Sequence, residues 1–161
     1  MSDAPYVGGR TLLLSIRPNY VHQILKGEKT VELRRKRPGV QPSDPVLIYA
    51  SAPTYALVGV FIVESIIEDS PTKLWGRIGK KSGISAATYR HYFEGAASGV
   101  ALSILSVWEA PNSISLKELR VLWPGFSPPQ SYRYISFDLL AKLPGKWRSF
   151  SQNKNHQLFA R

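Results

Sequence analysis

Cysteine is absent from the 161-residue sequence, methionine occurs once, and acidic residues are scarce. The absence of cysteine excludes disulfide bonds and thiolate-bound metal ions. No apolar run approaches the roughly 20 residues that cross a bilayer as a helix. The N-terminal segment also lacks the basic and apolar regions of a secretory signal. We therefore expect a soluble, cytoplasmic protein without a membrane partner.

The shortage of acidic residues leaves a strongly basic chain. It has 21 Lys and Arg against 11 Asp and Glu, a net charge of +10 at pH 7. Residues 26–37 hold six basic and two acidic side chains, and residues 141–161 hold five basic and none acidic. Two concentrated positive regions indicate a polyanionic partner. Nucleic acid is the commonest such partner, because binding its phosphates releases counterions.

Hydrophobic patterning predicts six short strands and several helices. The predicted strands are residues 11–16, 29–34, 46–50, 57–67, 100–108 and 132–136. Helices are predicted between Pro18 and Gly27, over residues 71–78 and 85–93, and after Ser115. Several strands follow one another without a helix between them, which argues against a doubly wound parallel sheet. We expect an α+β fold, a small and mostly antiparallel β-barrel of about six strands with peripheral helices.

The chain has the composition of one globular domain, with 43% apolar and 20% charged residues. We expect a flexible leader over residues 1–10, a folded domain over residues 11–143, and a basic tail over residues 144–161. The tail is predicted because few apolar anchors follow Leu143.

Residues 29–34 alternate between polar and apolar side chains. In a strand, this pattern places Thr30, Glu32 and Arg34 on one face. A carboxylate there can accept a hydrogen bond from the exocyclic amine of a base, and a guanidinium can bind phosphate or a base edge. Lys29 at the preceding turn and Arg17 after the first strand can reach the same place. The alternative is that Glu32 and Arg34 pair with each other on a solvated face.

Three segments together resemble one known family. They are residues 15–35, with the turn Gly27-Glu28-Lys29-Thr30, the strand 46–50 with the following Ser51-Ala52-Pro53, and residues 129–134. This arrangement is similar to the ASCH domain family, a branch of the PUA-like barrels, over about residues 11–137. The resemblance implies a PUA-like β-barrel whose cleft faces a nucleic acid, a nucleotide or a modified base.

Charge pattern and resemblance together predict a nucleic-acid-binding protein, with RNA favoured over DNA. We expect the cleft to recognise a single base, and a modified nucleoside is a further expected ligand. The predicted binding residues are Arg17, Lys29, Thr30, Glu32, Arg34, Arg35, Lys36, Arg37, Tyr49, Ser51, Gln130, Ser131, Tyr132 and Arg133.

An enzymatic alternative comes from the same resemblance, which includes amidohydrolases that act on acylated cytidine. The family lysine matches Lys29, but Glu32 stands where those enzymes have a threonine, and residues 79–83 contain no carboxylate. Lys29 and Glu32 are thus the only catalytic candidates, as a general acid/base pair. The sequence favours a binding protein over an enzyme.

A third hypothesis is a helix-turn-helix regulator that reads DNA through residues 78–93, with Thr88, Arg90 and His91 facing the major groove. The strand predicted directly upstream leaves no room for the third helix of that motif, so an ordinary helical corner is favoured. The three histidines, His22, His91 and His156, are too scattered to predict a metal site. We expect no cofactor.

Overall fold

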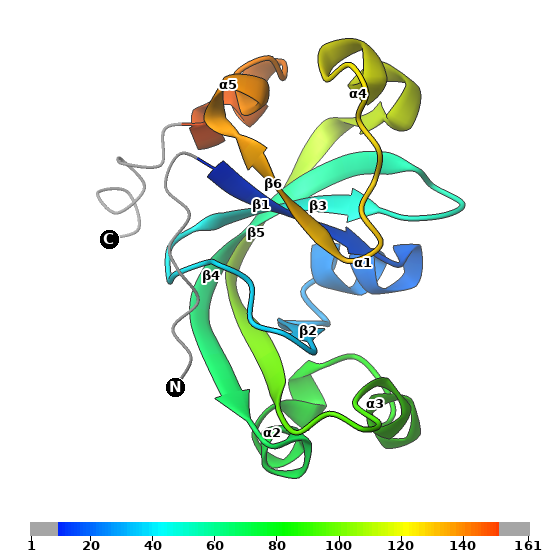
Figure 1. Cartoon of the computed structure of the whole chain (residues 1–161), viewed down its shortest axis with the longest axis vertical. Helices are drawn as coiled ribbons and strands as arrows, with labels where there is room; N and C mark the ends of the chain where they lie inside the picture. The colour runs from blue at the N-terminus through cyan, green and yellow to red at the C-terminus, as the bar shows by residue number, and fades with distance from the viewer. Residues whose placement is uncertain (1–9, 152–161) are drawn as a thin grey trace.

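The computed structural model describes residues 10–151 (Figure 1). Its strands are β1 (Arg10–Ile16), β2 (Val31–Arg34), β3 (Pro45–Ala50), β4 (Ala56–Asp69), β5 (Gly99–Ser115) and β6 (Tyr132–Ser136). Its α-helices are α1 (Pro18–Leu25), α2 (Pro71–Ile78), α3 (Ala86–Tyr92), α4 (Leu116–Leu122) and α5 (Phe137–Leu140). Two 3-10 helices, η1 (Gly79–Lys81) and η2 (Gly145–Ser151), complete the fold.

The six strands form one mixed sheet in the order β2-β5-β4-β3-β1-β6. Strands β1 and β3 are parallel, and the other four neighbouring pairs are antiparallel. The predicted α+β class is confirmed, but the predicted antiparallel barrel is wrong. The sheet is mixed because α1 and β2 separate β1 from β3, which returns the chain to the same end. It does not close into a barrel, because the edge strands β2 and β6 share no backbone ladder.

A long hairpin of β4 and β5 extends the sheet at both ends. Its strands have 14 and 17 residues, and their register shifts at three places, which bends the ribbon. One end carries a helical arm, residues 70–93, that contains α2, η1 and α3, and the other end leads into α4 (Figure 1). The hairpin thus separates the two groups of helices.

Serine side chains begin four of the helices. Ser70, Ser85 and Ser115 each accept a hydrogen bond from the backbone N–H three residues on, at 3.4, 3.1 and 3.1 Å, as the sequence pattern predicts. Ser136 caps α5 in the same way, at 3.2 Å. These local caps fix where each helix leaves the sheet.

The core has three clusters. Two of them lie on opposite faces of the sheet, because successive side chains of a strand point to opposite faces. Leu13, Leu47 and Tyr49 point into a cluster beneath α4, α5 and η2, while Leu12 and Leu14 point into a cluster with α1 on the other face. A smaller cluster fixes the helical arm to β2 and β5 through Leu74, Ile78, Tyr89 and Phe93. The arm is therefore packed on the sheet through an apolar core of its own.

The folded region extends beyond the predicted boundary at residue 143. Helix η2 buries Trp147 and Phe150, whose rings lie 4.9 and 5.6 Å from the Trp108 ring. Residues 145–151 therefore belong to the domain and not to a tail. Residues 1–9 and 152–161 lie outside the described part of the chain, so the leader and the remainder of the basic tail stay predictions, and Arg10 already belongs to β1.

We predict that Trp147→Ala destabilises the protein by about 3–5 kcal/mol, because it removes a buried indole and leaves a cavity beside Trp108. Urea unfolding measures the change. Arg148→Ala is the matched control, since Arg148 is exposed and its loss should change the free energy of unfolding by less than about 0.5 kcal/mol. Equal stability of Trp147→Ala and wild type would place η2 outside the cooperative fold.

Candidate functional site

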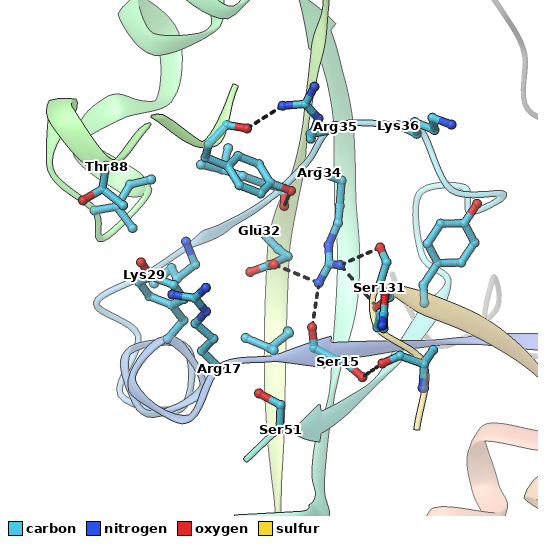
Figure 2. Close-up of a pocket in the computed structure, with 18 of the residues that line it drawn as sticks. Ser15, Arg17, Lys29, Glu32, Arg34, Arg35, Lys36, Ser51, Thr88 and Ser131 are labelled. Carbon is cyan, nitrogen blue, oxygen red and sulfur yellow. Dashed lines mark hydrogen bonds and ion pairs between the residues drawn. The ribbon is translucent and has the colours of Figure 1, made fainter. Parts of the chain in front are cut away.

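A cleft of about 850 Å³ lies between the ends of β1 and β2, the start of α1, helix α3 and the loop that precedes β6. Figure 2 shows the polar side chains of β1, β2 and this loop converging on it. The lining residues are Ser15, Ile16, Arg17, Tyr20, Lys29, Glu32, Leu33, Arg34, Arg35, Lys36, Ser51, Ile84, Thr88, His91, Tyr92, Pro129, Gln130, Ser131 and Tyr132.

Strand β2 supplies the floor of the cleft. Glu32 and Arg34 lie on the same face, as the alternation predicts, but they are only 7% and 8% exposed. The sequence predicted that this polar face lines a cleft, with a solvated face as the alternative. In the structure, α3 and the loop before β6 line the same cleft and cover the face. Buried charges must be paired and hydrogen-bonded to be tolerated, so their partners define the site.

Both terminal nitrogens of Arg34 are bound by fixed acceptors, while its Nε is buried without a hydrogen-bond partner among the described residues. One terminal nitrogen donates to Glu32 Oε1 at 3.1 Å and to the Ser15 carbonyl at 3.2 Å, and the other donates to the Ser131 hydroxyl at 3.2 Å and carbonyl at 3.3 Å (Figure 2). The ion pair between Glu32 and Arg34 is therefore present, but it is buried. Because its terminal donors are occupied, Arg34 positions Glu32 and joins strands more than it offers a charge to a ligand.

Lys29 is the second buried charge, at 3% exposed. Its ammonium donates to the Ser82 carbonyl in the turn of the helical arm and lies 5.2 Å from the centre of the Tyr20 ring. Burial lowers the pKa of Lys29 below its usual value, although the nearby Glu32 carboxylate opposes this shift. An amine in this setting can exchange a proton nearer to neutral pH than an exposed lysine can.

Gly83 makes the close approach between the arm and Lys29 possible. It has a φ of +69°, and a Cβ there would collide with the Gln23 side-chain oxygen and press on Lys29 Cβ at 3.3 Å. Gly83 forms a sharp turn between η1 and α3. It lies against β2 and does not serve as the free turn of a DNA-binding motif.

Helix α3 forms the opposite wall with Thr88, His91 and Tyr92. The Tyr92 hydroxyl donates to the Leu33 carbonyl at 3.2 Å, and Arg35 donates to the Tyr92 and Glu94 carbonyls at 2.8 and 3.1 Å. Thr88 and His91, assigned to a DNA-reading helix in the third hypothesis, thus line the cleft instead. Within the described residues, this placement favours the reading of residues 78–93 as a helical corner that forms part of the cleft, over a DNA-reading motif.

The structure brings most predicted site residues together. Ten of them line the cleft: Arg17, Lys29, Glu32, Arg34, Arg35, Lys36, Ser51, Gln130, Ser131 and Tyr132. Tyr20, Tyr92 and Ser15 also line it, and sequence reasoning missed them. For Tyr20 the sequence does hold a signal. It lies in the first turn of the helix that starts at Pro18, three residues after the predicted site residue Arg17.

Four predicted residues lie elsewhere. Thr30 uses its backbone N–H and carbonyl to join Lys81 and Ile104, and Arg37 is 3.8 Å from Glu68. Tyr49 is 1% exposed and packs against Phe126 in the core. Arg133 donates to the Ser127 carbonyl at 3.3 Å and covers the same Phe126 ring. None of the four lines the cleft.

Within residues 10–151, no three His, Cys, Asp or Glu side chains gather closely enough to hold a metal ion. No helix in the same range has the length and apolar character needed to cross a bilayer.

Comparison with known proteins identifies the family of this chain. The family model of the ASCH domain matches residues 14–117. An ASCH domain-containing ribonuclease from Zymomonas mobilis is 32% identical over 143 residues, which are 89% of this chain and 95% of that protein. The chain therefore belongs to the ASCH domain family, a PUA-like family, and the resemblance seen in the sequence is confirmed.

Solved structures of ASCH from Zymomonas mobilis share the fold. One superimposes with a TM-score of 0.78 at 30% identity, covering 82% of this chain and 92% of that one. A tyrosine-to-phenylalanine variant of the same protein gives a TM-score of 0.75 at 28% identity, covering 92% and 97%. Each comparison spans nearly the whole relative, so the similarity is not confined to one motif.

We predict a pH-dependent stability difference between the wild type and Lys29→Met. Burial lowers the pKa of Lys29 in the folded state, while the unfolded state keeps the usual 10.5. Between these two values the unfolded chain binds more protons, so the free energy of unfolding of the wild type rises relative to the variant as pH rises toward 10.5.

Urea unfolding of both proteins at several pH values measures this difference. Lys117→Met is the control, because Lys117 is exposed on α4 and its difference from wild type should stay flat. A difference between wild type and Lys29→Met that stays flat or falls with rising pH would contradict the buried, destabilised ammonium.

Proposed function

We propose that the protein binds single-stranded RNA, holds one unpaired nucleotide in the cleft, and cleaves the strand there. The observation that carries this proposal is the charge of the cleft wall. Five cations, Arg17, Lys29, Arg34, Arg35 and Lys36, surround a single carboxylate, Glu32. Such a wall attracts a polyanion, and the carboxylate adds a discriminating acceptor.

The size of the cleft supports one nucleotide and not a duplex. About 850 Å³ lies within the usual range of roughly 300–1,000 Å³ for small-ligand pockets. Sequence-specific RNA recognition uses unpaired bases that stack on aromatic rings and bond through their edges. Tyr20, Tyr92 and Tyr132 supply rings in the wall on which a base can stack.

Exposure separates the cations that would bind phosphate from those that support them. Arg35 and Lys36 are exposed at the rim of the cleft, whereas Lys29 and Arg34 are buried below it. Exposed cations bind backbone phosphates without reading sequence. We assign Arg35 and Lys36 to the phosphates, and Glu32 to the ribose at the cleaved position.

Two observations support cleavage. The relative from Zymomonas mobilis, similar over 95% of its length, is named a ribonuclease. The cleft also places Lys29, an amine with a lowered pKa, in the electrostatic field of Glu32. A carboxylate and an amine tuned by burial are the groups that general acid/base catalysis uses.

The chemistry available to these groups is attack by the ribose 2′-hydroxyl on the adjacent phosphorus. The bond from phosphorus to the 5′ oxygen breaks, and the products are a 2′,3′-cyclic phosphate and a 5′-hydroxyl. Glu32 would accept the proton of the 2′-hydroxyl. The Lys29 ammonium would stabilise the charge on the phosphoryl oxygens and give a proton to the leaving oxygen.

We predict that Lys36→Ala weakens the binding of a single-stranded RNA oligonucleotide uniformly across sequences. The slope of log K against log salt should fall in magnitude by roughly 0.7, because one phosphate contact is lost. Fluorescence anisotropy across a salt series measures both quantities, with Lys117→Ala as the exposed control. If Lys36→Ala binds RNA as tightly as wild type does, Lys36 at the rim does not contact the RNA.

The same oligonucleotides report cleavage. Lys29→Ala should yield no cyclic-phosphate product even at protein concentrations that saturate the RNA. A substrate with 2′-deoxyribose at the cleaved position should also stay intact. Turnover of N4-acylated cytidine, with RNA left uncut, would contradict RNA cleavage and support the amidohydrolase alternative. Preferential binding of duplex DNA would support the helix-turn-helix regulator.

A further inference from the structure

The helical arm carries a positive surface that the cleft does not use. Between residues 70 and 93 the chain has five basic residues and no acidic ones. All five are exposed, and none forms an ion pair within residues 10–151: Lys73, Arg77, Lys80, Lys81 and Arg90. A surface of one sign without compensating charge attracts a polyanion.

A second, smaller hollow lies in this surface, between α2 and α3. Its volume is about 290 Å³, and Pro71, Trp75, Tyr89, Arg90 and Phe93 are among its lining residues. The Trp75 and Tyr89 rings are 4.6 Å apart, and the Tyr89 and Phe93 rings are 4.7 Å apart. Tyr89 and Phe93 are each only 3% exposed, whereas Trp75 is partly buried. Trp75 therefore presents the accessible ring of the hollow, beside Arg90 and supported from below by the two buried rings.

Helix α3 separates this hollow from the cleft. Its residues Thr88, His91 and Tyr92 line the cleft, while Tyr89 and Arg90 line the hollow. The two sites thus lie on two sides of one helix, whose diameter with side chains is about 10–12 Å. A strand that leaves the cleft over α3 reaches the hollow within a few nucleotides.

We propose that this hollow, the arm site, binds a second base of the same RNA strand that occupies the cleft. The inference rests on the proposed function and extends it to a two-site footprint. Aromatic rings with an adjacent arginine form a stacking platform for any base, and the surrounding cations bind the phosphates that flank it. The arm carries five cations, and acidic side chains occur only at its two ends, as Asp69 and Glu94. This excess of positive charge selects a nucleic acid over an apolar peptide as the occupant.

The length of the RNA tests the arm site separately from the cleft. We compare a single-stranded RNA of about four nucleotides, which fills the cleft, with one of about twelve, which also crosses α3. Wild type should bind the longer RNA more tightly. Trp75→Leu, which keeps apolar packing but removes the aromatic face, should lose roughly 5- to 100-fold for the longer RNA and leave the shorter one unchanged.

Arg90→Ala provides a second variant that disturbs no core packing, since Arg90 is exposed. It should weaken only the longer RNA and lower its salt dependence, whereas Lys117→Ala on α4, at the other end of the molecule in Figure 1, should match wild type. A 2-aminopurine base placed outside the cleft nucleotide should be quenched by stacking in wild type and less so in Trp75→Leu.

The possible failures are distinguishable. If wild type binds both lengths equally, or if both arm variants bind the longer RNA as wild type does, the arm site is wrong and the cleft proposal stands. A proline-rich peptide bound at the arm with no competition from RNA would also overturn it. If wild type does not bind the shorter RNA, the proposed function itself fails.

Discussion

The fold depends on one buried guanidinium that joins the two edges of the open sheet. Strands β2 and β6 are the outermost strands and share no ladder, yet Arg34 on β2 donates to Ser131, the residue just before β6, and to Ser15 on β1. A second bond, from Gly39 N–H to the Tyr134 hydroxyl at 2.7 Å, repeats the link further along. In a closed barrel, backbone hydrogen bonds would join the two edge strands. Here side chains join them along a line that we call the seam, and the cleft lies along this seam.

This arrangement divides the basic run 34–37 into separate tasks. Arg34 holds the seam, Arg35 holds the cleft wall on α3, and Arg37 approaches Glu68 on β4. Lys36 makes no such contact among the described residues and stays at the rim. The contacts of this run therefore hold the walls of the cleft together, in addition to giving the cleft positive charge. Under the proposed function, phosphate binding by this run falls to its two exposed members, Arg35 and Lys36. Arg17 and the helical arm would supply the remaining positive charge for RNA.

Local signals in the sequence predict most elements, but not how they pair. The caps Ser70, Ser85 and Ser115 and the strand face shared by Glu32 and Arg34 follow from short-range chemistry. The parallel partnership of β1 and β3 does not, since nothing within either strand specifies its neighbour. Tyr49 was predicted in the cleft as an aromatic beside a loop, yet its parity with Leu47 places it in the core. Helix η2 was missed because its two apolar anchors fall within a basic segment.

Hydrogen exchange of Arg34→Lys tests the seam most directly, because lysine keeps the charge beside Glu32 but cannot form the forked bonds. The account predicts that amide exchange accelerates at both sheet edges together, in β2 and β6, while the β4–β5 hairpin keeps its protection. It also predicts that the variant binds the short RNA less tightly, because the cleft loses its shape. Unchanged exchange at β6, or acceleration confined to β2, would contradict the central role assigned to Arg34.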